Sequence, residues 1–307
     1  MAVCESLVKK MAEIYHYPVM YREVLELLKI EGKRIIVDCT MGIGSHASKL
    51  LAAMDKDSFL IGIDRDEDSL GVARQRLKSF EGKFSLFKAD FSDLDRVLSE
   101  SNIEGVDAFL FDLGISTYQL SNAVRGFSFL KEGPLDMRMD KNSFVSAYDL
   151  INNLSEIELG NIFKKFGEER YYRKIAQLLV EERKNEPIST TTQLAQIIMR
   201  NVPVKNRYSR IHPATRIFQS LRIAVNRELE ALTSGLAKAI SLLNSGGRIV
   251  VISFHSLEDR IVKHTLRDYA AQDQLKIITK KPLVPTEEES QENFASRSAK
   301  LRVAEKI

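Results

Sequence analysis

Residues 35–47 read IIVDCTMGIGSHA, an apolar run that ends on a carboxylate and leads into a glycine-rich bend. The segment that follows, SHASKLLAAM (45–54), carries apolar residues at helical spacing. A buried strand, a glycine-rich turn and a helix are typical of the first unit of an open α/β sheet, where glycines let the main chain approach a ligand closely. The stretch therefore predicts a ligand site at the end of a strand.

Further apolar runs alternate with helix-patterned segments up to Gly114. The four runs in this part are RIIVDCT (34–40), FLIGID (59–64), FSLFKAD (84–90) and VDAFLFDLG (106–114). Strand patterns return at GRIVVISF (247–254), LKIITK (275–280) and LRVAEKI (301–307). Strands that alternate with helices predict βαβ units around a parallel sheet, so we expect an α/β, Rossmann-like fold.

Residues 121–224 interrupt this alternation and are mostly helical in pattern. An insertion after the fourth strand lies at the carboxyl ends of the strands, where open α/β sheets bind their ligands. We therefore expect a discontinuous sheet domain, residues 1–120 and 225–307, and a mainly helical insertion domain, residues 121–224.

The composition is that of a soluble globular protein, with 44% hydrophobic and 28% charged residues among 307. No run approaches the roughly 18 apolar residues of a membrane span, so we expect no membrane association. The two cysteines, Cys4 and Cys39, are far apart, and Cys39 lies in an apolar strand pattern. We expect Cys39 to be a core side chain and the protein to be cytoplasmic, in a reducing compartment.

The glycine bend also fits a dinucleotide fingerprint. Gly42, Gly44 and Ala47 satisfy G-x-G-x-x-G/A, and Asp64 follows about 20 residues later, as that fingerprint requires. An NAD-dependent oxidoreductase is therefore one interpretation of the sequence.

The charge at the strand ends favours a different ligand. Each of the first four predicted strands ends on a carboxylate, namely Asp38, Asp64, Asp90 and Asp112. In a parallel sheet these ends meet at one edge, where they repel a pyrophosphate but attract the sulfonium and ammonium groups of S-adenosylmethionine. Carboxylates also bind divalent cations, but DRDED (64–68) lacks the glycine and glutamate of a calcium loop, so we expect no metal.

Position suggests a role for each residue at this edge. Gly42 and Gly44, with Ser45 and His46, present main-chain groups to the methionine moiety. Asp64 accepts from the ribose hydroxyls, and the Phe91 ring, next to Asp90, offers a stacking face to adenine. Asp112 lies nearest the reacting methyl group. The residues of these motifs are all present in the sequence.

A basic segment between Arg200 and Arg222 contains no acidic residue. Its cations and rings are Arg200, Lys205, Arg207, Tyr208, Arg210, His212, Arg216, Phe218 and Arg222. Such a segment binds phosphates and stacks on unpaired bases, so it favours RNA, although a solvated helix face has the same pattern.

The segment SFHSLEDR (253–260) joins the fifth strand to a helix. Ser256 and Asp259 have the spacing of a capping box, which predicts Ser256 as the N-cap. His255 is then close to the same sheet edge, in either a structural or a catalytic role. The absence of a G-x-S-x-G elbow argues against a serine hydrolase.

Several motifs together resemble the bacterial 16S ribosomal RNA (cytosine-N4)-methyltransferase family. They are VDCTMGIGSH (37–46), DLGISTYQL (112–120), RGFSF (125–129), GPLDMRMD (133–140) and SFHSLEDRIVK (253–263), and the likeness runs from His16 to Ile307. The resemblance implies the sheet of class I S-adenosylmethionine-dependent methyltransferases, with an insertion that helps to recognise RNA. It also implies methyl transfer to the exocyclic N4 of a cytidine in the decoding region of 16S ribosomal RNA, with this RNA in the assembled or assembling small subunit as the partner.

The family's donor-binding positions correspond here to Gly44, Ser45, His46, Asp64, Phe91, Asp112 and Gln119. Gln119 comes from the resemblance alone. Ser45 replaces a glycine that the family usually has, and Thr117-Tyr118 replaces Ser-Pro.

The catalytic hypothesis follows from the weak nucleophilicity of the cytosine amine. Asp112, or the main chain of DLGIS (112–116), accepts a hydrogen bond from N4 and directs its lone pair towards the methyl group, and Ser116 assists. The target base has to leave its stack to reach this place. Besides the NAD-dependent oxidoreductase, a non-catalytic RNA-binding protein on a methyltransferase-like fold remains an alternative.

Overall fold

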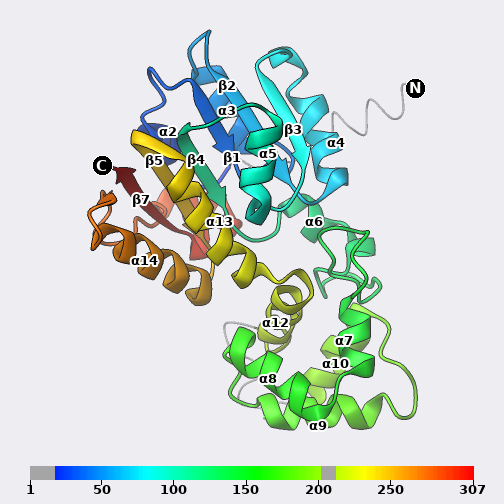
Figure 1. The fold of residues 1–307 in the computed structure, drawn as a ribbon. Helices are drawn as coiled ribbons and strands as arrows, with labels where there is room; N and C mark the ends of the chain where they lie inside the picture. Colours follow the sequence, from blue (N-terminus) through cyan, green and yellow to red (C-terminus); the bar gives the residue numbers. More distant parts are fainter. Residues whose placement is uncertain (1–17, 202–211) are drawn as a thin grey trace, which may run out of the picture. The chain divides into compact units, whose positions relative to one another are not determined.

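The computed structural model describes residues 18–201 and 212–307. The chain divides into two compact units, the first made of residues up to Thr117 together with Leu229–Ile307, and the second of Tyr118–Glu228. Figure 1 shows both units as ribbons coloured along the sequence. We describe each unit by itself.

A seven-stranded sheet of order β3-β2-β1-β4-β5-β7-β6 forms the centre of the first unit. The strands are β1 Ile35–Asp38, β2 Phe59–Asp64, β3 Phe84–Lys88, β4 Val106–Asp112, β5 Leu243–Ser253, β6 Leu275–Ile277 and β7 Lys300–Lys306. The first five are mutually parallel, which confirms the predicted Rossmann-like α/β sheet. The expectation of an entirely parallel sheet is wrong at one edge, because β7 runs antiparallel to both β5 and β6.

Helices cover both faces of this sheet (Figure 1). On one face α2 (Tyr21–Leu28), α3 (Ser45–Ala53) and α4 (Glu67–Arg76) pack on strand residues such as Ile36 and Leu60. On the other face, α5 (Leu94–Glu100), α13 (Glu228–Leu242) and α14 (Ser256–Ala270) pack on the next residues of the same strands, such as Val37 and Ile61. Burial on both faces explains why the strands read as nearly continuous apolar runs.

The first unit also confirms the expectation for Cys39, which is 1% exposed within the core on the α5 side of the sheet. Apolar surroundings suit a small thiol of this kind, and burial raises its pKa well above the usual value. The remaining elements of this unit are α15 (Glu287–Glu292) and three 3₁₀ helices, η1 Lys78–Phe80, η2 Phe91–Asp93 and η4 Phe294–Ser298.

The second unit is mostly helical. The helices among its described residues are α7 (Ala147–Asn153), α8 (Glu156–Gly167), α9 (Tyr172–Glu182), α10 (Thr191–Asn201) and α12 (Ala214–Asn226). They are preceded by η3 (Ala123–Arg125) and by α6 (Thr117–Ser121), which begins at the unit boundary. Capping boxes start two of these helices: Ser146 pairs with Asp149 at α7, and Ser155 pairs with Glu158 at α8. Phe163 of α8 and Leu221 of α12 are fully buried, so the amphipathic helices close around a core of their own.

Within residues 18–201 and 212–307, no helix combines the length and the apolar composition that crossing a bilayer requires.

Candidate active site at the carboxyl edge of the sheet

The glycine bend after β1 is held in place by β2. Gly42 and Gly44 have φ angles of 49° and 77°, in the left-handed region that glycine adopts without a steric penalty. The Gly42 N–H donates to Oδ2 of Asp64 at 2.7 Å. A Cβ atom on Gly44 would lie 3.3 Å from the Cβ of Ala73 on α4, so the second glycine also allows α3 and α4 to pack closely. Contacts within the chain therefore hold the bend in place.

Asp64, at the end of β2, connects the bend to the next helix. Its Oδ1 accepts from the Asp66 N–H at 2.8 Å, while Oδ2 accepts from Gly42. Burial raises the pKa of Asp64 to about 6, although both N–H donors oppose the shift. A carboxylate accepts about four hydrogen bonds, so Asp64 retains acceptor capacity for further donors such as hydroxyl groups.

Asp38, at the end of β1, is almost completely enclosed, with 1% of its surface exposed. Its Oδ1 accepts from the Thr40 N–H at 3.1 Å. Burial raises the pKa of Asp38 to about 7, against the opposing effect of His46. Asp38 is therefore a buried member of this edge and is not a surface charge.

Asp112, at the end of β4, faces the imidazole of His46 on α3. Oδ2 of Asp112 lies 3.4 Å from Nε2 of His46, and the Asp112 main-chain N–H donates to the Thr40 hydroxyl at 2.6 Å. The other carboxylate oxygen, Oδ1, has no hydrogen-bond partner among the described residues. Because β1 and β4 are neighbours from which the chain continues in opposite directions across the sheet, this is the switch point at which open α/β sheets bind ligands.

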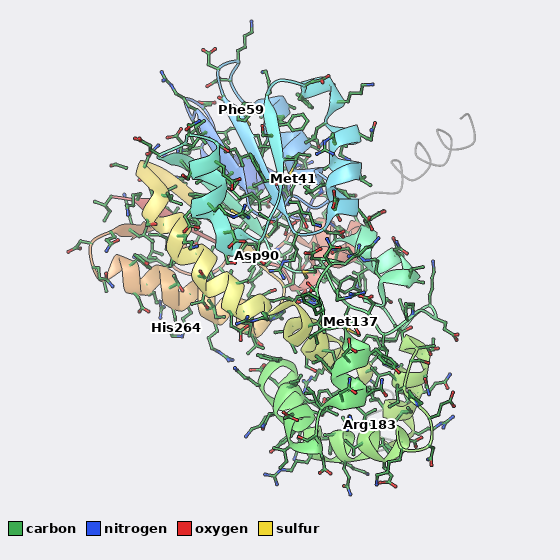
Figure 2. The ribbon with its side chains drawn as sticks, turned by 45° about the vertical axis from the view of Figure 1, so that its right-hand side comes forward. Met41, Phe59, Asp90, Met137, Arg183 and His264 are labelled. Carbon is green, nitrogen blue, oxygen red and sulfur yellow. The ribbon has the colours of Figure 1, made fainter. Side chains whose placement is uncertain are left out.

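The fourth aspartate lies differently from the prediction. Strand β3 ends at Lys88, so Asp90 belongs to the following turn and caps η2 by accepting from the Ser92 N–H at 2.7 Å. Asp90 also forms an ion pair with Arg65. The prediction that all four strands end on a carboxylate is therefore wrong for β3, although Asp90 is still close to that strand end (Figure 2).

Two basic side chains lie among these carboxylates, Arg65 beside Asp90 and the His46 imidazole beside Asp112. The prediction from the strand-end carboxylates did not include these two groups. The carboxylates are paired or hydrogen-bonded one by one, so their combined field on a ligand is weaker than that of four free charges.

Phe91 is half-buried next to this edge. Its ring meets Phe111 edge-on, with centroids 5.6 Å apart, and the Arg65 guanidinium lies 6.0 Å from the ring centroid. A Cβ on Gly235 of α13 would come within 2.7 Å of the Phe91 ring, so the helix approaches closely there. These neighbours fix the plane of the ring. Stacking of adenine on it stays a prediction.

The remaining predicted residues are distributed between the two units. The Ser45 hydroxyl accepts a hydrogen bond from the guanidinium of Arg76 on α4. The serine that replaces the usual glycine of the family therefore has a hydrogen-bond partner. Ser116 lies close to the bend, since a Cβ on Gly42 would be 3.9 Å from its Cβ. Gln119 is buried on α6 in the second unit, and its part in ligand binding stays a prediction.

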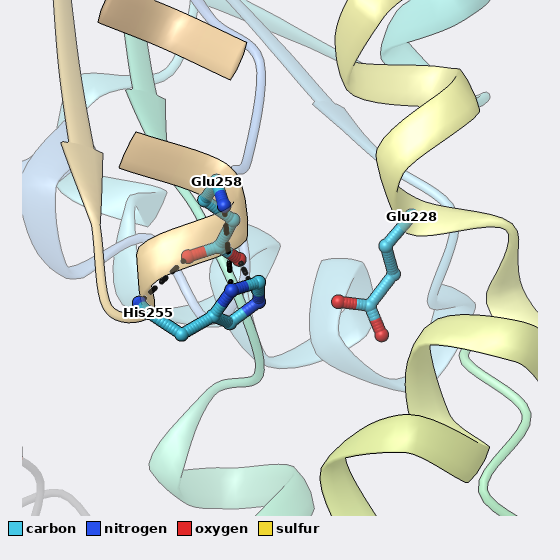
Figure 3. Close-up of side chains that lie close together, drawn as sticks. All are labelled: Glu228, His255 and Glu258. Atoms are coloured by element: carbon cyan, nitrogen blue, oxygen red, sulfur yellow. Dashed lines mark hydrogen bonds and ion pairs between the residues drawn. The ribbon is translucent and has the colours of Figure 1, made fainter. Parts of the chain in front are cut away.

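His255 is the N-cap of α14 (Figure 3). Its Nδ1 accepts from the Glu258 N–H at 3.3 Å, and Oε2 of Glu258 accepts from the main-chain N–H of Phe254 at 2.8 Å. The predicted capping box of Ser256 and Asp259 is thus wrong by one residue. The structural interpretation of His255 is confirmed.

The basic segment is only partly described. Lys205, Arg207, Tyr208 and Arg210 lie outside the described residues.

Among the described residues of this segment, Arg222 makes two hydrogen bonds of 2.8 Å to the carboxylate of Glu228, the third residue drawn in Figure 3. Phe218 is 5% exposed and packs edge-on against the Phe129 ring. The imidazole of His212 also packs on Phe129, with ring centroids 4.6 Å apart. The prediction that Arg222 and Phe218 are available to RNA is therefore wrong.

The motifs RGFSF and GPLDMRMD build one loop system inside the second unit. A Cβ on Gly126 would lie 2.2 Å from the carbonyl oxygen of Pro134, so the two motifs touch through their main chains. Buried Arg125 donates from Nη2 to the carbonyl oxygens of Arg138 and Met139. The sequence did not predict this role, because the contacts join residues that no local spacing relates.

Asn226, at the end of α12, completes this loop system. Its side-chain oxygen accepts from the Met139 N–H and its amide nitrogen donates to the Met137 carbonyl, both at 2.7 Å. Met137, labelled in Figure 2, is fully buried with a φ of 60°, a conformation that these two flanking contacts help to hold. Nothing in the sequence signalled Asn226.

Comparison with known proteins supplies the remaining observations. A family model described as "MraW methylase family" matches residues 13–307. A protein of Persephonella marina named "Ribosomal RNA small subunit methyltransferase H" is 49% identical over 294 residues, which are 96% of this chain and 100% of that protein. A protein of the same name from a Sulfurihydrogenibium species is 49% identical, over 96% of this chain and 100% of that protein. Another, from Geobacter sulfurreducens, is 48% identical, over 95% of this chain and 99% of that protein.

Proposed function

The chain belongs to the MraW methylase family, and on that premise we propose that it is a cytoplasmic enzyme that transfers a methyl group from S-adenosylmethionine to small-subunit ribosomal RNA. The observation that carries the proposal is the likeness at up to 49% identity along the full length of relatives named for this activity. The finer part of the proposal is that the acceptor is the exocyclic N4 of a cytidine in the decoding region of 16S RNA.

The residues of the carboxyl edge fit the methyl donor. Gly42 and Gly44 turn the main chain with left-handed φ angles and bring its N–H groups close to the strand ends. Asp64 would accept from ribose hydroxyls with the lone pairs that Gly42 and Asp66 leave available. The unpartnered Oδ1 of Asp112 offers an acceptor at the switch point. We assign donor binding to these residues together with Ser45, His46, Phe91 and Gln119.

S-Adenosylmethionine supplies a methyl group on a sulfonium: the amine nitrogen bonds to the methyl carbon, the carbon–sulfur bond breaks with its electron pair left on sulfur, and the amine loses a proton. The task of the chain is to orient the amine and to exclude water. Asp112 would accept a hydrogen bond from N4, and Ser116, beside the glycine bend, would assist. A base that reaches these residues has left its stack.

A basic surface of the second unit is suited to the RNA backbone. The exposed cations on α8, α9 and the turn between them are Lys164, Lys165, Arg170, Arg173 and Lys174, which we call the α8–α9 basic face. Lys164 and Arg173 both lie over the ring of Tyr172, at 5.6 and 5.5 Å from its centroid. We propose that this face contacts phosphates, because clustered exposed cations gain affinity by releasing counterions from nucleic acid.

The test is methyl transfer to small-subunit particles and to free 16S RNA prepared from a strain that lacks this activity. Purified protein and methyl-labelled S-adenosylmethionine should label the RNA, and nucleoside mass analysis should find N4-methylcytidine at one position. Asp112→Asn should lower the rate by at least about 100-fold, because the carboxylate acceptor is lost. His264 is exposed on α14 (Figure 2), so His264→Asn is the matched control and should leave the rate unchanged.

The other outcomes identify the alternatives. Label on a different atom or base would contradict the N4 assignment and keep the methyltransferase. RNA binding without transfer of label would indicate a non-catalytic RNA-binding protein. Thermal stabilisation by NAD, with none by S-adenosylmethionine, would indicate an oxidoreductase and overturn the proposal.

A further inference from the structure

His46 has an environment that donor binding through the main chain does not explain. It is the second residue of α3, and its imidazole is 6% exposed. The side chain points to the end of the neighbouring strand β4, where Nε2 lies 3.4 Å from Oδ2 of Asp112. Nε2 has no hydrogen-bond partner among the described residues, so its contact with Asp112 is a charge contact and not a hydrogen bond. A buried imidazole that meets a single carboxylate is a specific arrangement, because both groups lose hydration when they are enclosed.

The largest charge effects on His46 come from acidic groups. Asp112 on β4, Asp38 on β1 and Glu289 on α15 act on the imidazole. Burial lowers the pKa of His46, but these carboxylates outweigh it and raise the pKa above its ordinary value. The carboxylates therefore favour the cationic form of the imidazole more than water does, and a cationic imidazole attracts Oδ2 of Asp112.

The two oxygens of Asp112 are consequently not equivalent. Oδ2 faces the imidazole, whereas Oδ1 is enclosed and has no partner. An unpartnered buried carboxylate oxygen costs free energy unless a donor arrives, so it marks a place for a hydrogen-bond donor from outside the chain. An exocyclic amine is such a donor.

We propose that His46 is a positioning residue: it holds Oδ2 of Asp112 through Nε2 and so directs Oδ1 towards the N–H of the amine that becomes methylated. This inference rests on the proposed function and adds a residue whose imidazole acts through Asp112. The main chain of His46 can bind the donor independently of this role, so the two contributions are separable by substitution.

The test measures the ion pair and the reaction separately. The measurement is an NMR titration of protein that carries isotope-labelled histidine. The His46 signal is assigned by its loss in His46→Asn. Its titration midpoint should lie above the ordinary value of about 6.5, and should fall in Asp112→Asn, where the carboxylate is absent. The His264 signal, from an exposed imidazole, is the internal control and should not move.

The reaction is measured with His46→Asn and His46→Gln, which retain a polar side chain without the positive charge. Single-turnover methyl transfer should fall by about 10- to 100-fold, because the carboxylate acceptor is misplaced. The dissociation constant for S-adenosylmethionine, measured by calorimetry, should change less than about threefold. His46→Asn and Asp112→Asn should be far from additive when combined.

Three results would overturn the proposal. The first is a His46 midpoint that is unchanged in Asp112→Asn. The second is a transfer rate that stays within about twofold of the wild type in both folded variants. The third is a loss confined to donor affinity, which would mean that the His46 side chain binds the donor and does not position Asp112. Wild-type protein that transfers no methyl group would defeat the proposed function, whereas the titration would still decide the His46–Asp112 pair.

Discussion

Single residues at the carboxyl edge of the sheet show how burial changes the chemistry of a carboxylate. Asp38, Asp64 and Asp112 all end parallel strands. Asp38 and Asp64 have pKa values of about 7 and about 6, because burial disfavours the ionised form more strongly than the nearby N–H donors favour it. A strand-end aspartate is therefore not automatically a negative charge at neutral pH.

Asp38 leads to a prediction for stability. The folded protein keeps the Asp38 proton up to about pH 7, and the unfolded chain releases it near pH 4, so this group makes stability decrease as the pH rises between these values. Asp38→Asn cannot ionise and should stabilise the protein by up to about 4 kcal/mol at pH 8, with little effect near pH 4. Urea unfolding at both pH values measures this, with exposed Asp57→Asn as the control. An equal effect at both pH values would contradict the explanation.

Helices and loops in this protein begin and close through side-chain contacts that propensity alone does not specify. Strand β5 passes into α14 through His255 and Glu258, which cap each other's main chain. In the second unit the RGFSF and GPLDMRMD loops close on main-chain contacts that only glycine permits. These are element-scale features, because each depends on the geometry of one turn or one loop.

The capping role of His255 is testable by truncation. His255→Ala removes the Nδ1 acceptor for the Glu258 N–H and should lower the free energy of unfolding by about 1 kcal/mol, as other N-cap losses do. His264→Ala makes the same chemical change at an exposed position of the same helix and should lie within about 0.5 kcal/mol of the wild type. Denaturant unfolding compares them, and equal losses would exclude a cap-specific effect.

Gly126 provides a test of the loop contact. In Gly126→Ala the new Cβ would meet the Pro134 carbonyl oxygen at 2.2 Å, and φ is already 71°, so we expect a loss of at least about 2 kcal/mol. In Gly160→Ala, in α8 of the same unit, the new Cβ would meet side chains only at ordinary contact distances, the Tyr172 ring at 3.5 Å and the Cβ of Ala176 at 3.8 Å. This control should change stability by less than about 1 kcal/mol, in the stabilising direction that helix propensity gives. If both variants unfold alike, the close approach is not what requires glycine at 126.

At the scale of the whole molecule, the chain leaves the first unit after β4 and returns to it at α13. The sheet is therefore built from two distant parts of the sequence, since β4 pairs with β5. Both hydrophobic clusters of the sheet consist of residues of the first unit alone. A complete core of this kind lets the helical unit specialise, and we propose recognition of RNA as its role.

The α8–α9 basic face makes a prediction about salt. Replacing both Lys164 and Lys165 by alanine should weaken binding to small-subunit RNA and reduce the slope of log affinity against log salt by about 1.5, because two phosphate contacts are lost. Exposed Lys56→Ala in the first unit is the control and should leave the slope unchanged. Filter binding over a series of salt concentrations measures both variants. A reduced affinity with an unchanged slope would indicate that the lysines do not contact phosphates.

Much of this protein follows from its sequence alone. The strand ends at Asp38, Asp64 and Asp112, the left-handed bend at Gly42 and Gly44, and the helical second unit all follow from local periodicity and residue type. These signals act within one turn or one strand, where neighbours in sequence are also neighbours in space.

Tertiary structure alone decided which charges meet. It paired Asp112 with His46 and Asp90 with Arg65, and it placed β7 antiparallel beside β5. The physical reason is that a carboxylate's ionisation and a strand's direction depend on the atoms packed against them, and these come from parts of the chain that no spacing pattern connects.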